Sequence, residues 1–163
     1  MGLIVDSFAG GGGASTGIRM ALGRDPDIAI NHNAEAMAMH KANHPGTRHY
    51  IEDIWGVDPI AVTAGEPVDL MWLSPDCTHF SKARGSAPKS DRIRGLAWTA
   101  VKWARRVRPR LIILENVEEF QDWCPLDKRG FPKMHLRGTI FNKFVRHLRR
   151  EGYSVDYREL TAC

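Results

Sequence analysis

Four consecutive glycines, Gly10 to Gly13, lie between an apolar run and a segment with helical spacing, and this arrangement limits the folds open to the chain. The run Leu3 to Phe8 is predicted to be a strand, and Ala14 to Leu22 a helix that ends at Gly23. Glycine lets the backbone pass close to a ligand, and a helix N-terminus offers N–H groups to an anionic part of that ligand. The opening unit therefore predicts the nucleotide-binding first crossover of an α/β sheet.

The alternation of apolar runs with helix-period segments continues along the chain, which is typical of a parallel sheet covered by helices. Further strands are predicted at 28–31, 48–51, 68–73, 111–114 and 153–160, and further helices at 34–42, from 58, at 96–107 and at 140–148. Asn33 and Asp58 are the expected N-caps of two of these helices. The run 111–114 is apolar throughout, as in strands that are buried on both faces. Two long loops are expected at 74–94 and 121–138, and loops of this length often carry function.

The composition of the 163 residues, 43% hydrophobic and 26% charged, is that of one ordinary globular domain. Apolar runs fall far short of the roughly 20 residues that cross a bilayer, and the N-terminus lacks the pattern of a signal peptide, so we expect a cytoplasmic protein without a membrane partner. Three cysteines, an odd number, fit a reducing compartment. The net charge of +4, with a pI near 9.1, is compatible with a nucleic-acid partner but does not establish one.

Two polar clusters follow predicted strands, at the edge of the sheet where ligands bind in open α/β folds. The first, Pro75-Asp76-Cys77-Thr78-His79-Phe80-Ser81, offers Cys77 as a nucleophile, with a buried and unreactive thiol as the alternative. The second is Glu115-Asn116-Val117. Its carboxylate either caps a helix or forms a surface ion pair, or it is directed into the same crevice as Cys77.

The glycine turn, the Pro-x-Cys-x-x-Phe-Ser loop and the Glu-Asn-Val strand end, in this order and spacing, resemble the DNA (cytosine-5)-methyltransferase family. The resemblance covers nearly the whole chain. It implies a Rossmann-like methyltransferase fold with a mostly parallel sheet and helices on both faces, of which residues 1–163 are the cofactor-binding and catalytic part. It also implies methyl transfer from S-adenosylmethionine to C5 of cytosine in DNA, as in restriction–modification, with RNA-methylating relatives as a lesser possibility.

The resemblance also implies roles for individual residues. The cofactor-binding residues are Phe8, Gly10, Gly12, Asn31, Asp53 and Leu96, with Asn31 at the ribose and Asp53 at the adenine amino group. Cys77 is the nucleophile that adds to C6 of the base, and Glu115 is the acid that holds the target cytosine. Phe80 and Ser81 end the nucleophile loop, and the cations that follow, Lys82 and Arg84, are expected to contact DNA phosphates.

Three departures from the family pattern qualify these roles. Asn31 stands where the family has Glu, which removes a charge at the ribose. Asp76 replaces the Pro before the nucleophile, and its carboxylate opposes thiolate formation unless it pairs with Lys82 or Arg84. The residues given end where the family continues into a Gln-x-Arg-x-Arg segment and a target recognition region. We therefore expect a truncated fold without a recognition domain, weak and non-specific DNA binding, and dependence on a C-terminal half in cis or in trans.

Two other functions remain open. The chain can be a catalytically silent module that binds S-adenosylmethionine or serves as one subunit of a split enzyme. It can also be an unrelated Rossmann-type enzyme that uses Cys77 differently. A dinucleotide site is disfavoured, because the Gly-x-Gly-x-x spacings in the glycine run end in Ser15 or Thr16 rather than Gly or Ala.

Three histidines, His40, His44 and His49, lie near Asn43 in the sequence and raise the question of a metal site. No Cys-x-x-Cys accompanies them, so we expect solvated or capping roles and predict no metal. The basic residues of the predicted helices, Lys102 among them, are expected on solvated faces. Three tryptophans, Trp98, Trp103 and Trp123, are expected to pack in the interior.

Overall fold

The computed structural model describes residues 1–77 and 90–160, and the chain divides into two compact units. The first unit consists of residues 1–75 and 102–115, and the second of residues 76–101 and 116–163. Each unit has its own core, and the two are described in turn.

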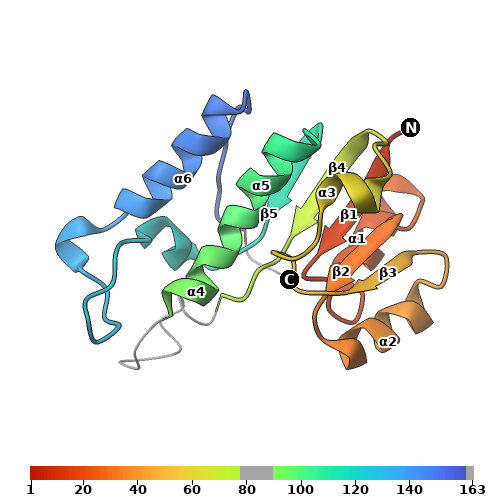
Figure 1. The fold of residues 1–163 in the computed structure, drawn as a ribbon, viewed down its shortest axis with the longest axis horizontal. Coiled ribbons are helices and arrows are strands. Elements are labelled where there is room, and N and C mark those ends of the chain that lie inside the picture. Colours follow the sequence, from red (N-terminus) through yellow and green to blue (C-terminus); the bar gives the residue numbers. More distant parts are fainter. Residues whose placement is uncertain (78–89, 161–163) are drawn as a thin grey trace. The chain divides into compact units, whose positions relative to one another are not determined.

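A five-stranded parallel sheet forms the centre of the first unit (Figure 1). Its strands are β1 Leu3–Ser7, β2 Ile28–Asn31, β3 Arg48–Ile51, β4 Val68–Leu73 and β5 Leu111–Leu114, in the order β3-β2-β1-β4-β5. Every neighbouring pair is parallel, which confirms the predicted sheet. The strand order reverses between β1 and β4, and ligands of this fold class bind outside the carboxyl ends of the strands at such a reversal.

Helices cover both faces of this sheet. They are α1 Gly13–Leu22, α2 Ala34–Asn43, α3 Pro59–Thr63 and the part of α5 Thr99–Arg106 that belongs to this unit. Right-handed crossovers place α1 and α2 on one face, and the reversal of strand order places α3 and α5 on the other. Ile18 of α1 packs against Ile4 and Leu70, and Met37 of α2 packs against Ala29.

The ends of these helices follow the predicted capping residues. The Asn33 side chain accepts hydrogen bonds from the N–H groups of Glu35 and Ala36 at the start of α2. Asp58 accepts from the N–H of Ile60 at the start of α3. Both caps satisfy backbone donors that a helix N-terminus would otherwise leave without partners, so local sequence determines where these helices begin.

The second unit is helical and is held together by aromatic side chains. Its elements are α4 Asp91–Arg94, the first part of α5, α6 Thr139–Arg150 and three short 3₁₀ segments, Gly95–Trp98, Glu118–Asp122 and Met134–Leu136. The Trp98 ring lies 5.7 Å from that of Trp123 and 5.5 Å from that of Phe144, while Phe120 contacts Phe141 at 5.5 Å. These contacts confirm the predicted packing roles of Trp98 and Trp123.

Three predictions about secondary structure and burial are wrong. Residues 153–160 form no strand, because the described residues supply no partner strand for their backbone groups. Strand β5, at the edge of the described sheet, is not buried on both faces: Leu111 is 52% exposed and the other three residues are only partly buried. The predicted loop at 74–94 already contains a helical turn at its end, capped by the Ser90 side chain.

Among the described helices, none has the length and apolar character needed to cross a membrane.

Candidate cofactor-binding and active site

The glycine turn after β1 is packed on one side and open on the other. Phe8, with φ of 63°, and Gly12, with φ of 106°, both adopt left-handed backbone, which is unusual for a residue such as Phe8. A Cβ added at Gly12 would lie 2.7 Å from the His44 ring, so only glycine fits there. A Cβ added at Gly10 or Gly13 would meet no described atom within 4 Å. The open side therefore leaves room for a ligand beside the backbone.

The N-terminus of α1 adjoins this open side. Its N-cap is Gly12, and no described side chain caps the first turn. Backbone N–H groups at such a position carry partial positive charge and bind anionic groups. The turn thus fits the carboxylate end of an amino-acid-bearing cofactor such as S-adenosylmethionine.

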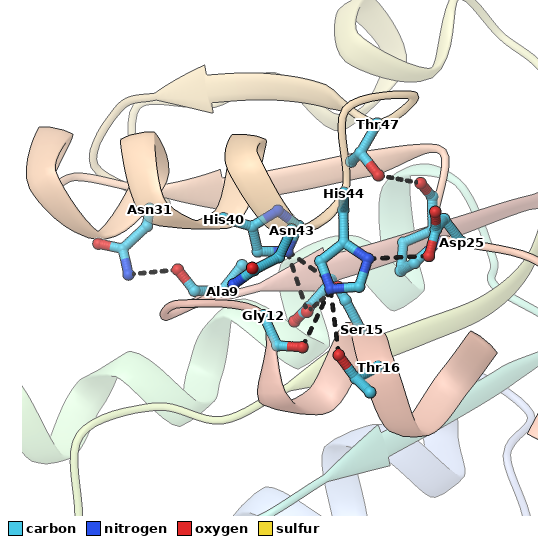
Figure 2. A network of polar contacts seen from close by, with 12 residues as sticks. Ala9, Gly12, Ser15, Thr16, Asp25, Asn31, His40, Asn43, His44 and Thr47 are labelled. Atoms are coloured by element: carbon cyan, nitrogen blue, oxygen red, sulfur yellow. Dashed lines mark hydrogen bonds and ion pairs between the residues drawn. The ribbon is translucent and has the colours of Figure 1, made fainter. Parts of the chain in front are cut away.

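A buried polar network lies behind the turn and joins α1 to α2 (Figure 2). The Ser15 hydroxyl donates to Asp6 Oδ2 at 2.7 Å and therefore accepts from His40 Nε2 at 2.9 Å. With the proton on Nε2, the neutral His40 ring accepts at Nδ1 from His49 Nε2, 2.9 Å away. Asp6, Ser15 and His40 are fully buried, which makes the solvated role predicted for His40 wrong.

Burial also shifts the acid–base behaviour of this network. Desolvation raises the pKa of Asp6 from 3.8 to about 6, although the Ser15 hydrogen bond opposes the shift. Desolvation, together with the neighbouring His44 and His49, lowers the pKa of His40 from 6.5 to about 4. At neutral pH the network therefore holds an ionised Asp6 and a neutral His40.

Solvated or capping roles are also predicted for His44 and Asn43, which lie near His40 in the sequence. His44 does follow α2 as its C-cap, but its ring is fully buried and contacts Asp25 and the glycine turn. Asn43 donates from Nδ2 to the Gly11 carbonyl oxygen at 2.7 Å. Both residues hold the backbone of the turn, a role that the sequence analysis missed.

Asn31 is the last residue of β2, and Asp53 follows β3 at the same edge of the sheet. Asn31 donates from Nδ2 to the Ala9 carbonyl at 2.8 Å and accepts at Oδ1 from the Asn33 N–H at 2.9 Å. Its amide therefore links the end of β2 to the loop after β1 (Figure 2). Asp53 is exposed and accepts from the Trp55 N–H at 2.9 Å, so its carboxylate is fixed in a turn but open to solvent.

Lys102 holds the turn that contains Asp53. Its ammonium group donates to the carbonyl oxygens of Trp55, at 2.7 Å, and Val57, at 2.6 Å, and lies 3.5 Å from that of Ile54. Desolvation lowers the Lys102 pKa. The prediction of a solvated Lys102 is therefore wrong, because its ammonium group contacts three backbone carbonyls. The sequence did not reveal these contacts because the partners lie 45 to 48 residues away.

The predicted catalytic residues come after β4 and β5, which are neighbouring strands as expected. Glu115 directly follows β5, is exposed, and donates its N–H to the Leu73 carbonyl at the end of β4. Cys77 lies four residues after β4, where the second unit begins, and its thiol is free and half-buried. Leu96 lies in the 3₁₀ segment before α5 and is also half-buried. The four remaining predictions, Phe80, Ser81, Lys82 and Arg84, fall outside the described residues.

Within residues 1–77 and 90–160, no three His, Cys, Asp or Glu side chains are grouped so that they could hold a metal ion.

Comparison with known families settles the relationship of the chain. The C-5 cytosine-specific DNA methylase family matches residues 3–163. The chain belongs to this family. Type II methyltransferase M.AgeI of Thalassovita gelatinovora is 28% identical over 98% of the chain, and M.DdeI of Desulfomicrobium norvegicum is 31% identical over 98%. The chain spans 35% and 36% of the lengths of these two relatives.

Solved structures of methyltransferases share the fold. A prophage protein of E. coli described as a DNA modification methyltransferase superposes with a TM-score of 0.67, at 21% identity, over 90% of this chain and 37% of its own. Spodoptera frugiperda DNMT2 gives 0.61, at 20% identity, over 90% of this chain and 40% of its own. These similarities confirm the predicted Rossmann-like methyltransferase fold.

The opposite shifts of Asp6 and His40 predict a pH effect on stability. As pH falls from about 6 to 3.8, protonation of Asp6 increases the free energy of unfolding, because the pKa of Asp6 is higher in the folded than in the unfolded protein. As pH falls from 6.5 to about 4, His40 decreases the free energy of unfolding, because its pKa is lower in the folded protein. The two effects oppose each other. Asp6→Asn should remove the compensation and make the free energy of unfolding fall more steeply on acidification from pH 6.5 to 4.

Urea unfolding at several pH values measures this slope, with Glu66→Gln, an exposed carboxylate, as the control. The control should follow the wild type. Equal slopes for Asp6→Asn and wild type would show that Asp6 and His40 do not titrate as the buried network requires.

Neighbouring glycines of the turn should respond differently to substitution. Gly12→Ala places a Cβ in left-handed backbone and against the His44 ring, and should destabilise the protein by about 1–3 kcal/mol. Gly13→Ala, in the first turn of α1 with open space around it, should lie within about 1 kcal/mol of wild type. Thermal unfolding of both variants tests this, and equal losses would contradict the packing described for Gly12.

Proposed function

We propose that this chain forms the cofactor-binding and catalytic part of an enzyme that methylates C5 of cytosine in DNA, with S-adenosylmethionine as methyl donor. The observation that carries the proposal is the set of candidate site residues at the carboxyl ends of the strands, in a chain of the C-5 cytosine methylase family. The glycine turn, Asp53 and Glu115 follow β1, β3 and β5, and Asn31 is the last residue of β2.

Residues after the first three strands would hold the cofactor. Gly10, Gly12 and the uncapped start of α1 receive its carboxylate end, and Asp53 accepts a hydrogen bond from the adenine amino group. The Asn31 oxygen and amide each retain the capacity for one further hydrogen bond, which suits the ribose hydroxyls. Phe8 and Leu96 remain predicted apolar contacts. When bound, S-adenosylmethionine supplies the methyl group.

Cys77 and Glu115 supply the chemistry on the base. The Cys77 thiolate adds to C6 of cytosine, while Glu115 in its protonated form donates a hydrogen bond to N3 and withdraws electron density from the ring. The electron pair gained by the ring makes C5 nucleophilic enough to take the methyl group. Loss of the C5 proton then expels the thiolate and restores both the ring and Cys77.

DNA binding would depend on cationic residues and on extrusion of the target base. Lys82 and Arg84 follow the nucleophile in the sequence and attract phosphates without reading base sequence. Extruding the base costs a few kcal/mol of stacking, which contacts from a recognition region offset in enzymes of this kind. These 163 residues span about a third of the curated relatives, so we expect weak, salt-sensitive DNA binding from them alone.

The cofactor assignment predicts binding of S-adenosylhomocysteine to the 163 residues. Asp53→Ala should weaken binding by about tenfold, the cost of one hydrogen bond to a charged group. Glu52→Ala is the matched control, because it removes the adjacent exposed carboxylate without touching Asp53. Isothermal titration measures all three proteins. A folded wild type that gives no heat at millimolar ligand, or equal losses in both variants, would contradict the assignment.

The catalytic assignment predicts no measurable methyl transfer by the 163 residues alone. Activity should appear when the remaining part of a relative such as M.DdeI is supplied in cis or in trans, and Cys77→Ser should abolish it. A tritiated methyl-transfer assay on mixed-sequence DNA tests both statements. Strong incorporation by the isolated chain, or by the Cys77→Ser protein, would contradict them, whereas cofactor binding without transfer by the completed protein favours a silent module.

A further inference from the structure

Helix α6, the blue helix of Figure 1, has a buried apolar face and an exposed cationic face. Its buried residues are all apolar and follow helical spacing: Phe141, Phe144, Val145 and Leu148. Its exposed residues are all polar: Thr139, Asn142, Lys143, Arg146, Arg149 and Arg150. The last four, termed the α6 cations, give this face a concentrated positive charge, and the helix contains no acidic residue.

The α6 cations are neighbours on the surface of the helix. Residues three or four positions apart adjoin each other on a helix, so Lys143 adjoins Arg146, and Arg146 adjoins both Arg149 and Arg150. Like charges at these spacings repel and weaken a helix. Arg149 and Arg150 lie in the last turn, where the helix dipole favours cations, but Lys143 and Arg146 lie before it. Helix stability therefore does not explain the whole row of charge.

Carboxylates of the chain do not offset this repulsion. Among residues 1–77 and 90–160, none of the α6 cations forms an ion pair. Two other exposed arginines of the second unit do have acidic partners. Arg137 Nε lies 2.6 Å from Asp122 Oδ1, and a terminal nitrogen of Arg158 lies 2.8 Å from Asp156 Oδ2. The α6 cations thus keep their charge available to a partner outside the described chain.

The composition of this face restricts the kind of partner that it fits. The exposed residues of α6 include no aromatic or aliphatic side chain of the kind that anchors protein–protein interfaces. An anionic membrane takes up the apolar face of an amphipathic helix, but in α6 that face is buried in the protein. The phosphates of duplex DNA need only cations and hydrogen-bond donors. Duplex DNA presents about six charges along the roughly 10 Å of helix from Lys143 to Arg150.

We propose that the α6 cations form a second DNA-contacting surface, which binds the phosphate backbone of duplex DNA without reading its sequence. The proposal goes beyond the proposed function, which assigns phosphate contacts to Lys82 and Arg84, and rests on it only in taking DNA as the partner. Phosphate contacts hold a protein on the duplex and carry no sequence information. The α6 cations thus supply part of the salt-sensitive DNA affinity of these 163 residues.

The test compares two triple variants that change the net charge by the same amount. The α6 variant combines Lys143→Gln, Arg146→Gln and Arg150→Gln. The control removes three exposed cations that are dispersed over the first unit, by Lys41→Gln, Arg48→Gln and Arg110→Gln.

Fluorescence anisotropy measures the binding of both variants and of the wild type to two DNA duplexes of unrelated sequence, from about 50 mM to about 200 mM salt. At low salt the α6 variant should bind both duplexes about tenfold more weakly than the control does. The slope of log affinity against log salt should become shallower by about 0.9 for each phosphate contact that the α6 variant loses.

Thermal unfolding shows whether the variants fold, and the α6 variant should unfold close to the wild-type temperature because it loses mutually repelling charges. If it does not fold, Arg146→Gln alone is compared with Arg48→Gln, and should bind DNA more weakly with a slope shallower by about 0.9.

Four results would overturn the proposal. They are equal losses in the α6 variant and the control, wild-type DNA binding by the α6 variant, no DNA binding by the folded wild type, and a loss of binding to anionic lipid vesicles with DNA binding unchanged. The last result would assign the α6 cations to a membrane surface. Titration of the wild type with S-adenosylhomocysteine tests the proposed function separately, so the two can fail independently.

Discussion

The close packing of the glycine turn on the end of α2 is the constraint on which the site depends. A Cβ at Gly11 would lie 2.7 Å from Met39 Sδ, and one at Gly12 would lie 2.7 Å from the His44 ring. At Gly12, which has a φ of 106° and faces the buried His44 ring, the backbone can approach α2 this closely only without a side chain, whereas the exposed Met39 side chain could move away from Gly11. The approach lets Asn43 and His44 reach the carbonyls of the turn. One face of the turn is thereby fixed by the protein, which leaves the other face with its N–H groups free to meet a ligand.

Buried charge near this turn is only partly compensated by specific partners: Asp6 Oδ2 accepts from the Ser15 hydroxyl, whereas Asp6 Oδ1 has no hydrogen-bond partner among the described residues. Asp6 sits in a central strand at a cost visible in its raised pKa, and the Ser15 hydroxyl offsets part of that cost. His40 fills the space behind Ser15 as a neutral ring. The hydrogen bonds of this network favour one arrangement of α1 and α2, while the buried Asp6 Oδ1 without a described partner limits the stability that the network adds.

The fold follows from local patterns, whereas much of the site does not. Apolar runs mark four of the five strands, and Asn33 and Asp58 mark the starts of two helices, so these elements could be predicted from neighbouring residues. Strand β3, with the sequence Arg-His-Tyr-Ile, is not an apolar run. The buried position of His40 and the partly buried position of Lys102 could not be predicted in this way, because both depend on hydrogen bonds to residues distant in the sequence. The expected strand at 153–160 failed for a related reason, since a strand requires a partner as well as β-forming residues.

The central claim, that a cofactor binds at the carboxyl edge of β1 to β3, is tested most directly by amide NMR of the ¹⁵N-labelled chain titrated with S-adenosylhomocysteine. The account predicts the largest shifts at the amides of residues 10–15 and 53–55, with little change at Gly65 and Glu66 before the opposite end of β4. A folded sample in which a saturating ligand leaves residues 10–15 and 53–55 unshifted, or shifts Gly65 and Glu66 instead, would contradict it.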